Sequence, residues 1–168
     1  MSGAGDFNGD GVSDVIVGAN RANHPGFADI GVAYVIFGHI VTSVGNAFGD
    51  IQLTTIALDP AIGFRMLGAA ADSWFGYSVS AAGDVNSDGF DDVIVGSIFA
   101  DPPTLPGSNA GIAYVIFGQN TTTFTDLYIS SLGASTPVGF QILGAAAGDQ
   151  TGLSVSAAGD VNNDGRTT

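Results

Sequence analysis

A nine-residue acidic loop recurs along this chain at nearly equal intervals. It reads DFNGDGVSD at 6–14, DVNSDGFDD at 84–92 and DVNNDGRTT at 160–168, so the copies begin 78 and 76 residues apart. Two apolar segments recur with almost the same period: GVAYVIFG at 31–38 returns as GIAYVIFG at 111–118, and GFRMLGAAA at 63–71 returns as GFQILGAAA at 139–147. Self-similarity at a fixed period indicates an array of repeats rather than one irregular domain.

The composition favours short strands over helices. The chain has 26 glycines in 168 residues, and all 16 acidic residues are Asp, with no Glu and no Lys, so good helix formers for exposed positions are scarce. Runs of β-branched and aromatic residues bounded by Gly, Pro or Asp predict strands in the central repeat. The predicted strands are 74–82, 92–98, 112–117 and an outer strand within 126–132, while 139–144 leads back toward the next inner strand. The acidic loop then joins the first strand to the second.

Four short strands per repeat, none able to bury its own faces, predict a β-propeller blade packed against other blades. We therefore predict an all-β fold of four-stranded antiparallel blades, about two per chain, with incomplete terminal blades. The predicted division is a first blade at 1–73 lacking most of its inner strand, a complete blade at 74–147, and a first strand with part of an acidic loop at 148–168. Incomplete blades expose strand edges. We expect self-association through terminal strands or other blades, for example with 152–159 of one copy completing another copy's first blade, which gives a ring or a filament.

The spacing of oxygen atoms in the loop is suited to Ca²⁺. Side chains at positions 1, 3, 5 and 9 and a backbone carbonyl at position 7 can supply the six to eight oxygen ligands that Ca²⁺ takes, and Gly at position 6 permits the sharp bend. The predicted ligands are Asp6, Asn8, Asp10, Val12 and Asp14; Asp84, Asn86, Asp88, Phe90 and Asp92; and Asp160, Asn162 and Asp164. The third loop has Thr168 at position 9, so the sequence predicts two calcium sites and leaves the third open.

Two alternatives compete with this interpretation of the loops. An EF-hand begins similarly but needs an acidic residue at position 12 and flanking helices, whereas Val17 and Val95 occupy that position within apolar strand-like runs. The loops could also be turns of Asp, Asn and Gly that bind nothing. Asn8 and Asn86 reduce the charge of the ligand set, which predicts an affinity in the range of extracellular calcium modules.

Net charge and missing residue types exclude several functions. A formal charge of −13 argues against nucleic acid or an anionic membrane as partner. The chain has no Cys, no apolar run long enough for a membrane span, and no signal peptide. His24 and His39 have no second His at ligand spacing, and without Cys, Lys or Glu the residues available for catalysis are few. We therefore expect a protein that is not an enzyme.

The motif order resembles the FG-GAP repeat of integrin alpha-subunit propellers and of bacterial and cyanobacterial surface proteins. The resemblance rests on Phe75-Gly76, the loop that follows, and Val95-Gly96, with a second copy at Val17-Gly18-Ala19. Departures include Asn20 in place of the motif's Pro, Ser97-Ile98 in place of Ala-Pro, and Thr151-Gly152 in place of Phe-Gly. Integrin-like propellers usually contain seven blades, whereas this chain holds about two.

The resemblance implies an extracellular or cell-surface module that binds calcium and has a structural or adhesive role. A protein or glycan ligand would be consistent with that role. The alternative is a lectin-like ligand-binding module, or a hydrolase-associated propeller fragment of a longer surface protein, with its ligand held by loops at one face.

Overall fold

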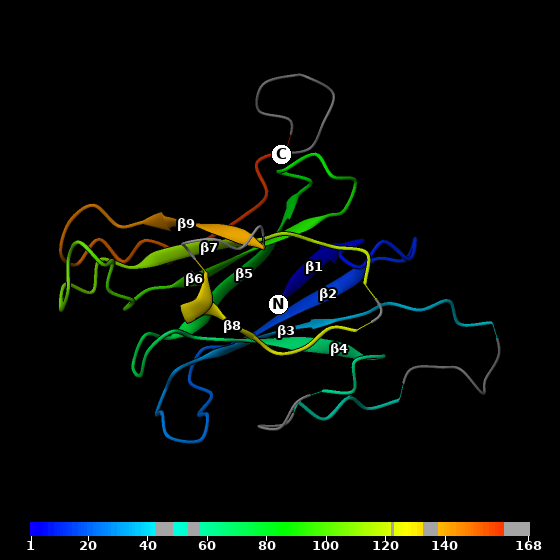
Figure 1. Cartoon of the computed structure of the whole chain (residues 1–168), viewed down its shortest axis with the longest axis horizontal. Helices are drawn as coiled ribbons and strands as arrows, with labels where there is room; N and C mark the ends of the chain where they lie inside the picture. The colour runs from blue at the N-terminus through cyan, green and yellow to red at the C-terminus, as the bar shows by residue number, and fades with distance from the viewer. Residues whose placement is uncertain (43–48, 54–57, 122, 133–137, 160–168) are drawn as a thin grey trace.

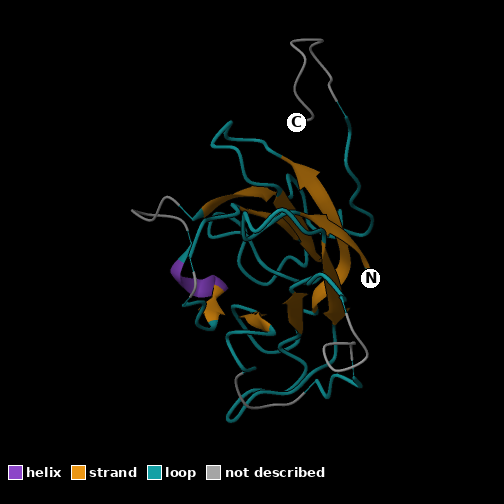
Figure 2. Ribbon diagram, turned by 90° about the vertical axis from the view of Figure 1, so that its right-hand side faces the viewer, coloured by secondary structure: helices purple, strands orange, loops and turns teal. Residues whose placement is uncertain are grey.

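The computed structural model describes residues 1–42, 49–53, 58–121, 123–132 and 138–159, which form two β-sheets and, in these ranges, no α-helix. The first sheet has the order β1-β2-β3-β4-β8 and the second the order β5-β6-β7-β9 (Figure 1). The bounds in the first sheet are β1 Ser2–Gly5, β2 Asp14–Ala19, β3 Val32–Ile36, β4 Gly63–Leu67 and β8 Leu127–Tyr128. Those in the second are β5 Phe75–Gly83, β6 Asp92–Ser97, β7 Ile112–Ile116 and β9 Gly139–Leu143. A single turn of 3₁₀-helix, η2 (Ile129–Ser131), lies next to β8 (Figure 2).

The two sheets are copies of each other, down to their register. Ile16 of β2 pairs with Val35 of β3, and the equivalent pair in the second sheet is Ile94 of β6 with Val115 of β7. All five residues of β3 and of β7 are buried, as expected for central strands rich in β-branched side chains. The prediction of an all-β fold built from antiparallel propeller blades is confirmed.

The prediction of where the fourth strand of the second sheet lies is wrong. We expected it within 126–132, but β9 (Gly139–Leu143) takes that place and pairs antiparallel with β7. The matching segment β4 pairs with β3 in the same register, so the repeated GF motif marks the start of the outer strand. Gly139 is required there because a Cβ would lie 2.1 Å from the Val115 carbonyl oxygen.

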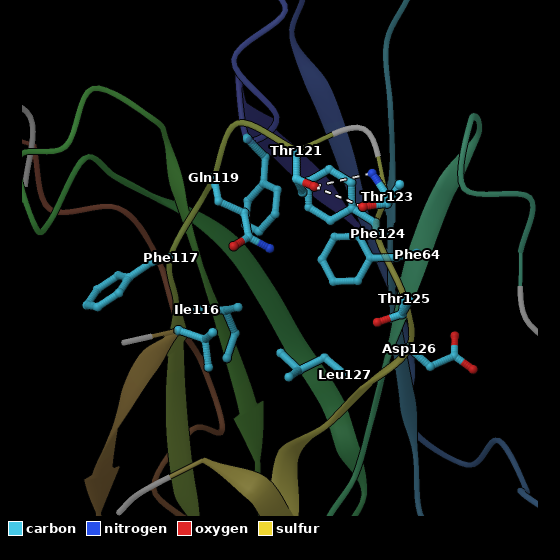
Figure 3. Close-up of a pocket in the computed structure, with 12 residues that line it drawn as sticks. Phe64, Ile116, Phe117, Gln119, Thr121, Thr123, Phe124, Thr125, Asp126 and Leu127 are labelled. Carbon is cyan, nitrogen blue, oxygen red and sulfur yellow. Dashed lines mark hydrogen bonds between the residues drawn. The ribbon is translucent and has the colours of Figure 1, made fainter. Parts of the chain in front are cut away.

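Residues 124–132, which we call the strap, cross from the second sheet to the first. Leu127 and Tyr128 pair with the outer strand β4 in parallel. The Phe124 ring stacks on Phe64 of β4 with centroids 5.0 Å apart, and the two rings lie together in the close-up (Figure 3). Asp126 forms an ion pair with the buried Arg65, also of β4. The strap therefore connects the two sheets by a strand pairing, a ring contact and an ion pair.

The core lies between the sheets. One cluster of buried side chains contains residues of both sheets and of the strap, with Phe7, Met66 and Ile129 among the largest buried. The backbones approach so closely that a Cβ on Gly18 would lie 2.1 Å from the carbonyl oxygen of Gly76. Since β5 packs on β1 and β2, the hairpin loops of the two sheets lie at neighbouring positions.

Candidate metal loops

Each complete acidic loop joins the first strand of a sheet to the second, as expected: the first follows β1 and the second follows β5. Both loops are hairpin connections, so each is held between two paired strands. The third loop, with the predicted ligands Asp160, Asn162 and Asp164, lies outside the described residues.

The first loop is wound around its own carboxylates. The backbone N–H groups of Asp10 and Gly11 donate to the two carboxylate oxygens of Asp6, both at 3.0 Å. The N–H of Asp10 also donates to Asn8 Oδ1, and that of Val12 to Asp10 Oδ1 at 2.8 Å. The second loop repeats these bonds one for one, among Asp84, Asn86, Asp88, Gly89 and Phe90. Two loops of different sequence thus turn their side-chain oxygens toward the loop interior in the same way.

Glycine at the sixth loop position is needed because of its backbone angles, not because a side chain would clash with its surroundings. Gly11 and Gly89 have φ angles of 85° and 93°, and neither has an atom within 4 Å of where a Cβ would lie. Side chains other than Gly are disfavoured at these angles. The predicted reason for this glycine, a sharp bend, is confirmed.

The ninth-position carboxylates are buried and fix each loop to its sheet. Asp14 accepts hydrogen bonds from the N–H of Phe7 at 3.0 Å and of Gly38 at 2.8 Å. The second loop repeats this arrangement, with Asp92 accepting from Val85 at 2.8 Å and from Gly118 at 2.9 Å. Gly38 and Gly118 follow the central strands β3 and β7, so each carboxylate bridges the loop and the sheet centre. Each carboxylate oxygen retains a second lone pair.

The two loops also contact each other, through a residue that the sequence analysis did not single out. The Asp91 carboxylate accepts a hydrogen bond from the Asp6 N–H at 2.8 Å, and the Asp91 N–H donates to the Asp6 carbonyl at 3.2 Å. The Phe90 ring lies against Gly9, where a Cβ would be 2.4 Å from it. The only hint in the sequence is that the first loop has Ser13 where the second has Asp91.

Burial raises the pKa of the ninth-position carboxyls. The pKa of Asp92 rises to about 6, first because burial disfavours its charge, and further because of the charges of Asp88 and Asp84; the hydrogen bonds from Gly118 and Val85 act against this rise. Burial likewise raises the pKa of Asp14, with the Asp10 charge adding to the effect. Both shifts therefore arise first from burial, and the neighbouring carboxylates of the loop add to them.

This pKa shift predicts how the metal-free protein responds to pH. A carboxyl whose pKa is higher in the folded than in the unfolded state contributes stability at low pH that is lost as the pH rises through the folded value. We therefore expect the Tm in calcium-free buffer to fall as the pH rises from about 4 to about 6. Asp101, whose pKa is lowered by the N–H groups of its own loop, acts in the opposite direction at lower pH. Circular dichroism melts across this range test the prediction, and a Tm that rises from pH 4 to pH 6 contradicts it.

The chemistry of the donor set decides which ion could fit. Within the described part of the chain, no group of three or more His, Cys, Asp or Glu converges on a metal position. The side-chain oxygens instead come from Asp and Asn together and face N–H groups of their own loop. Carboxylate, amide and backbone carbonyl oxygens are the ligands of a hard cation such as Ca²⁺. The residues fit that ion and do not fit a transition metal.

Several aromatic side chains and His24, all outside the loops, make packing contacts. Phe75 is buried in the core, in edge-on contact with Tyr114 at 5.5 Å. Trp74 packs against Phe99, and the Arg21 guanidinium lies 4.3 Å from the centre of the Trp74 ring. His24 meets the Tyr128 ring edge-on at 6.0 Å. Over the described ranges, no helix has the length and apolar character needed to cross a membrane.

Comparison with known proteins identifies the repeats. Residues 2–36 and 75–116 match the FG-GAP repeat. Integrin alpha ina-1 of Caenorhabditis elegans is 46% identical over 56 residues, 33% of this chain and 5% of that protein. Phosphatidylinositol-glycan-specific phospholipase D of Bos taurus is 33% identical over 114 residues, 68% of this chain and 12% of that protein. Integrin alpha-PS2 of Drosophila melanogaster is 28% identical over 166 residues, 96% of this chain and 9% of that protein.

The chain therefore spans only a small part of these relatives, between 5% and 12% of their length. Each matched segment includes one sheet's first three strands with its acidic loop. Two segments of this chain match the FG-GAP repeat, and each lies in an antiparallel sheet consistent with a β-propeller blade.

Proposed function

We propose that this protein is a calcium-binding, non-enzymatic module with a structural or adhesive role at the cell surface or outside the cell. The observation that carries the proposal is the duplicated loop, in which six hydrogen bonds within the loop and one to the glycine after the central strand recur at equivalent positions although the sequences differ. Similarity to two integrin alpha chains supports the location and the role.

The residues of each loop have distinct roles in this proposal. Asp6, Asn8 and Asp10 hold the loop in a ring of side-chain oxygens, and Val12 supplies its carbonyl. Asp14 ties the ring to the sheet, so order in the loop is transmitted to β3 through Gly38. A bound calcium ion would neutralise the carboxylates. Any ion that binds only the folded state stabilises that state.

Isothermal titration with calcium tests the proposal directly. We expect at least two sites per chain, with dissociation constants on the order of 10⁻⁴ to 10⁻³ M, because Asn at position 3 lowers the charge of the ligand set. Magnesium should bind more weakly, since it demands closer octahedral geometry. The absence of heat at millimolar calcium, checked by equilibrium dialysis, would refute the proposal.

A second candidate, a module that accompanies a hydrolase in a longer protein, is favoured by one comparison. The matched phospholipase D of Bos taurus is 33% identical over 68% of this chain, whereas integrin alpha-PS2 aligns with more of the chain, 96%, at the lower identity of 28%. The calcium loops would be the same in both cases. The two candidate functions differ in the ligand site that they require. The second function needs a site for substrate or glycan, made of polar groups outside the loops. Binding of the isolated chain to glycans or to phosphatidylinositol-glycan would favour the second.

A further inference from the structure

Asp91, at the eighth position of the second loop, holds the backbone of Asp6 from both sides. The Asp91 carboxylate accepts a hydrogen bond from the Asp6 N–H at 2.8 Å, and the Asp91 N–H donates to the Asp6 carbonyl at 3.2 Å. The contact is close, because a Cβ on Gly5 would lie 2.2 Å from the Asp91 carboxylate. Asp6 is the first predicted ligand of the first loop, so a residue of one loop fixes a ligand position of the other.

The place of Asp91 within its own loop links this contact to the ion proposed for the second loop. Asp91 lies between Phe90 and Asp92, which supply the predicted ligands at the seventh and ninth positions. A cation bound to both neighbours would fix the backbone on either side of Asp91, and with it the direction of its carboxylate. Groups that hold metal ligands in place from outside the ligand set affect metal affinity. Asp91 is placed to act on the first loop in this way.

A second connection joins the loops through the segment that follows β7. The Gln119 N–H donates to the carbonyl of Phe7, in the first loop, at 3.0 Å. The preceding residue, Gly118, donates its N–H to the buried Asp92 carboxylate at 2.9 Å. A Cβ on Gly118 would lie 2.8 Å from the Phe7 carbonyl oxygen and 2.4 Å from that of Asp91. The backbones of the two loops and of this segment are therefore packed too closely to admit a side chain between them.

We propose that Asp91 is a positioning residue that couples the two loops, so that calcium binding at either loop strengthens binding at the other. This inference rests on the proposed function, since it needs both loops to bind calcium. An ion in the second loop orders Asp6 through Asp91, and the first loop then loses less conformational freedom when it binds its own ion. Coupling between two sites is reciprocal, so an ion in the first loop has the same effect on the second.

Electrostatic repulsion acts against this coupling. The first loop carries three Asp and the second carries four. An ion in one loop reduces the negative charge that attracts an ion to the other. Salt screens this effect over about 8 Å at about 0.15 M, whereas the hydrogen bonds of Asp91 remain. We therefore expect a coupling of about fivefold at that ionic strength, and a stronger coupling at about 0.5 M.

NMR titration of the full chain with calcium measures the coupling, because each loop has its own reporter. The N–H groups of Gly11 and Gly89 each donate to the first Asp of their own loop, so each amide signal follows one loop. Asp88→Ala disables the second loop, and Asp160→Ala in every chain disables the third. We expect the Gly11 signal to titrate at about fivefold lower calcium when the second loop is intact than in Asp88→Ala. By reciprocity, the Gly89 signal should shift in the same way when Asp10→Ala disables the first loop.

Substitutions at Asp91 show whether this residue carries the coupling. In Asp91→Ala, the Gly11 signal should titrate at the same calcium concentration with and without Asp88→Ala. Asp91→Asn keeps an acceptor for the Asp6 N–H and should retain most of the coupling. Ser13→Ala is the matched control, at the exposed eighth position of the first loop, and should leave the coupling unchanged. Melting curves show whether each variant is folded.

Hydrogen exchange of the Asp6 N–H gives a readout that needs no substitution at Asp91. In Asp10→Ala with the third loop disabled, added calcium fills only the second loop. Because Asp91 accepts the hydrogen bond from the Asp6 N–H, exchange at this amide should slow about fivefold when calcium is added. A contact with a purely structural role would give an exchange rate that does not depend on calcium.

The possible failures of the inference and of the proposed function can be told apart. If both glycine signals titrate but neither depends on the other loop, or if Asp6 exchange does not change with calcium, the inference is overturned and calcium binding stands. Coupling that persists in Asp91→Ala would refute the role of Asp91. If neither glycine signal moves with calcium, the proposed function fails and the inference fails with it.

Discussion

Calcium is expected to raise the Tm of this protein by about 6–12 °C at ten times its dissociation constant. At that concentration each independent site adds about 1.4 kcal/mol to the free energy of unfolding. Two sites add about 3 kcal/mol, and each kcal/mol corresponds to about 2–4 °C for a domain of this size. Burial is the main reason that the pKa of Asp92 is raised, and the cation would relieve the smaller contribution that comes from the charges of Asp88 and Asp84. Differential scanning calorimetry in calcium and in EDTA measures the shift.

Ionic strength needs its own control in this experiment. With a net charge of −13, any salt stabilises the fold to some degree by screening. Sodium chloride at matched ionic strength should therefore give a small shift, and magnesium a shift smaller than that of calcium. Equal shifts from calcium and from matched sodium chloride would show that the effect is screening and that the loops bind no ion.

The substitution Asp92→Ala is expected to lower the free energy of unfolding by about 2–6 kcal/mol in calcium. It removes the acceptor for two N–H groups, those of Val85 and Gly118, and each buried N–H left without a partner costs about 1–3 kcal/mol. It also removes a ligand of the proposed second site. In metal-free protein the loss should be smaller, since the variant no longer buries a charge. Urea unfolding with and without calcium measures both values.

Two comparisons make the Asp92 result specific. Asp72→Asn changes an exposed carboxylate outside the loops and should leave stability and calcium binding unchanged. Asp14→Ala should act on the first loop as Asp92→Ala acts on the second, leaving one site to titrate in each variant. If Asp92→Ala binds as many calcium ions as the unsubstituted chain, Asp92 is not a ligand and its role is confined to the two hydrogen bonds.

The features that repeat could be predicted from the sequence. The period of 76–78 residues and the β-branched runs predicted two similar antiparallel sheets, and the position of the loops between first and second strands followed from the same pattern. Gly11 and Gly89 were expected at a sharp bend because their spacing within the loop requires one, and their positive φ angles agree.

The features that depend on contacts between the repeats could not be predicted in this way. The apolar pattern of 126–132 suits an outer strand of the second sheet, but Leu127, Ile129 and Leu132 are used against the first sheet. Periodicity shows which residues are apolar and does not show which sheet they cover. Asp91 was missed for the same reason, since its partner Asp6 lies 85 residues away and in the other repeat.

The most direct measurement is the anomalous diffraction signal of crystals grown in calcium. We predict one strong peak inside the first loop, surrounded by oxygens of Asp6, Asn8, Asp10, Val12 and Asp14. A second peak is predicted inside the other complete loop, with Asp92 bound to the ion. Well-ordered loops that show no anomalous density, and whose side-chain oxygens accept hydrogen bonds only from N–H groups of the same loop, would contradict the proposal that the loops bind calcium.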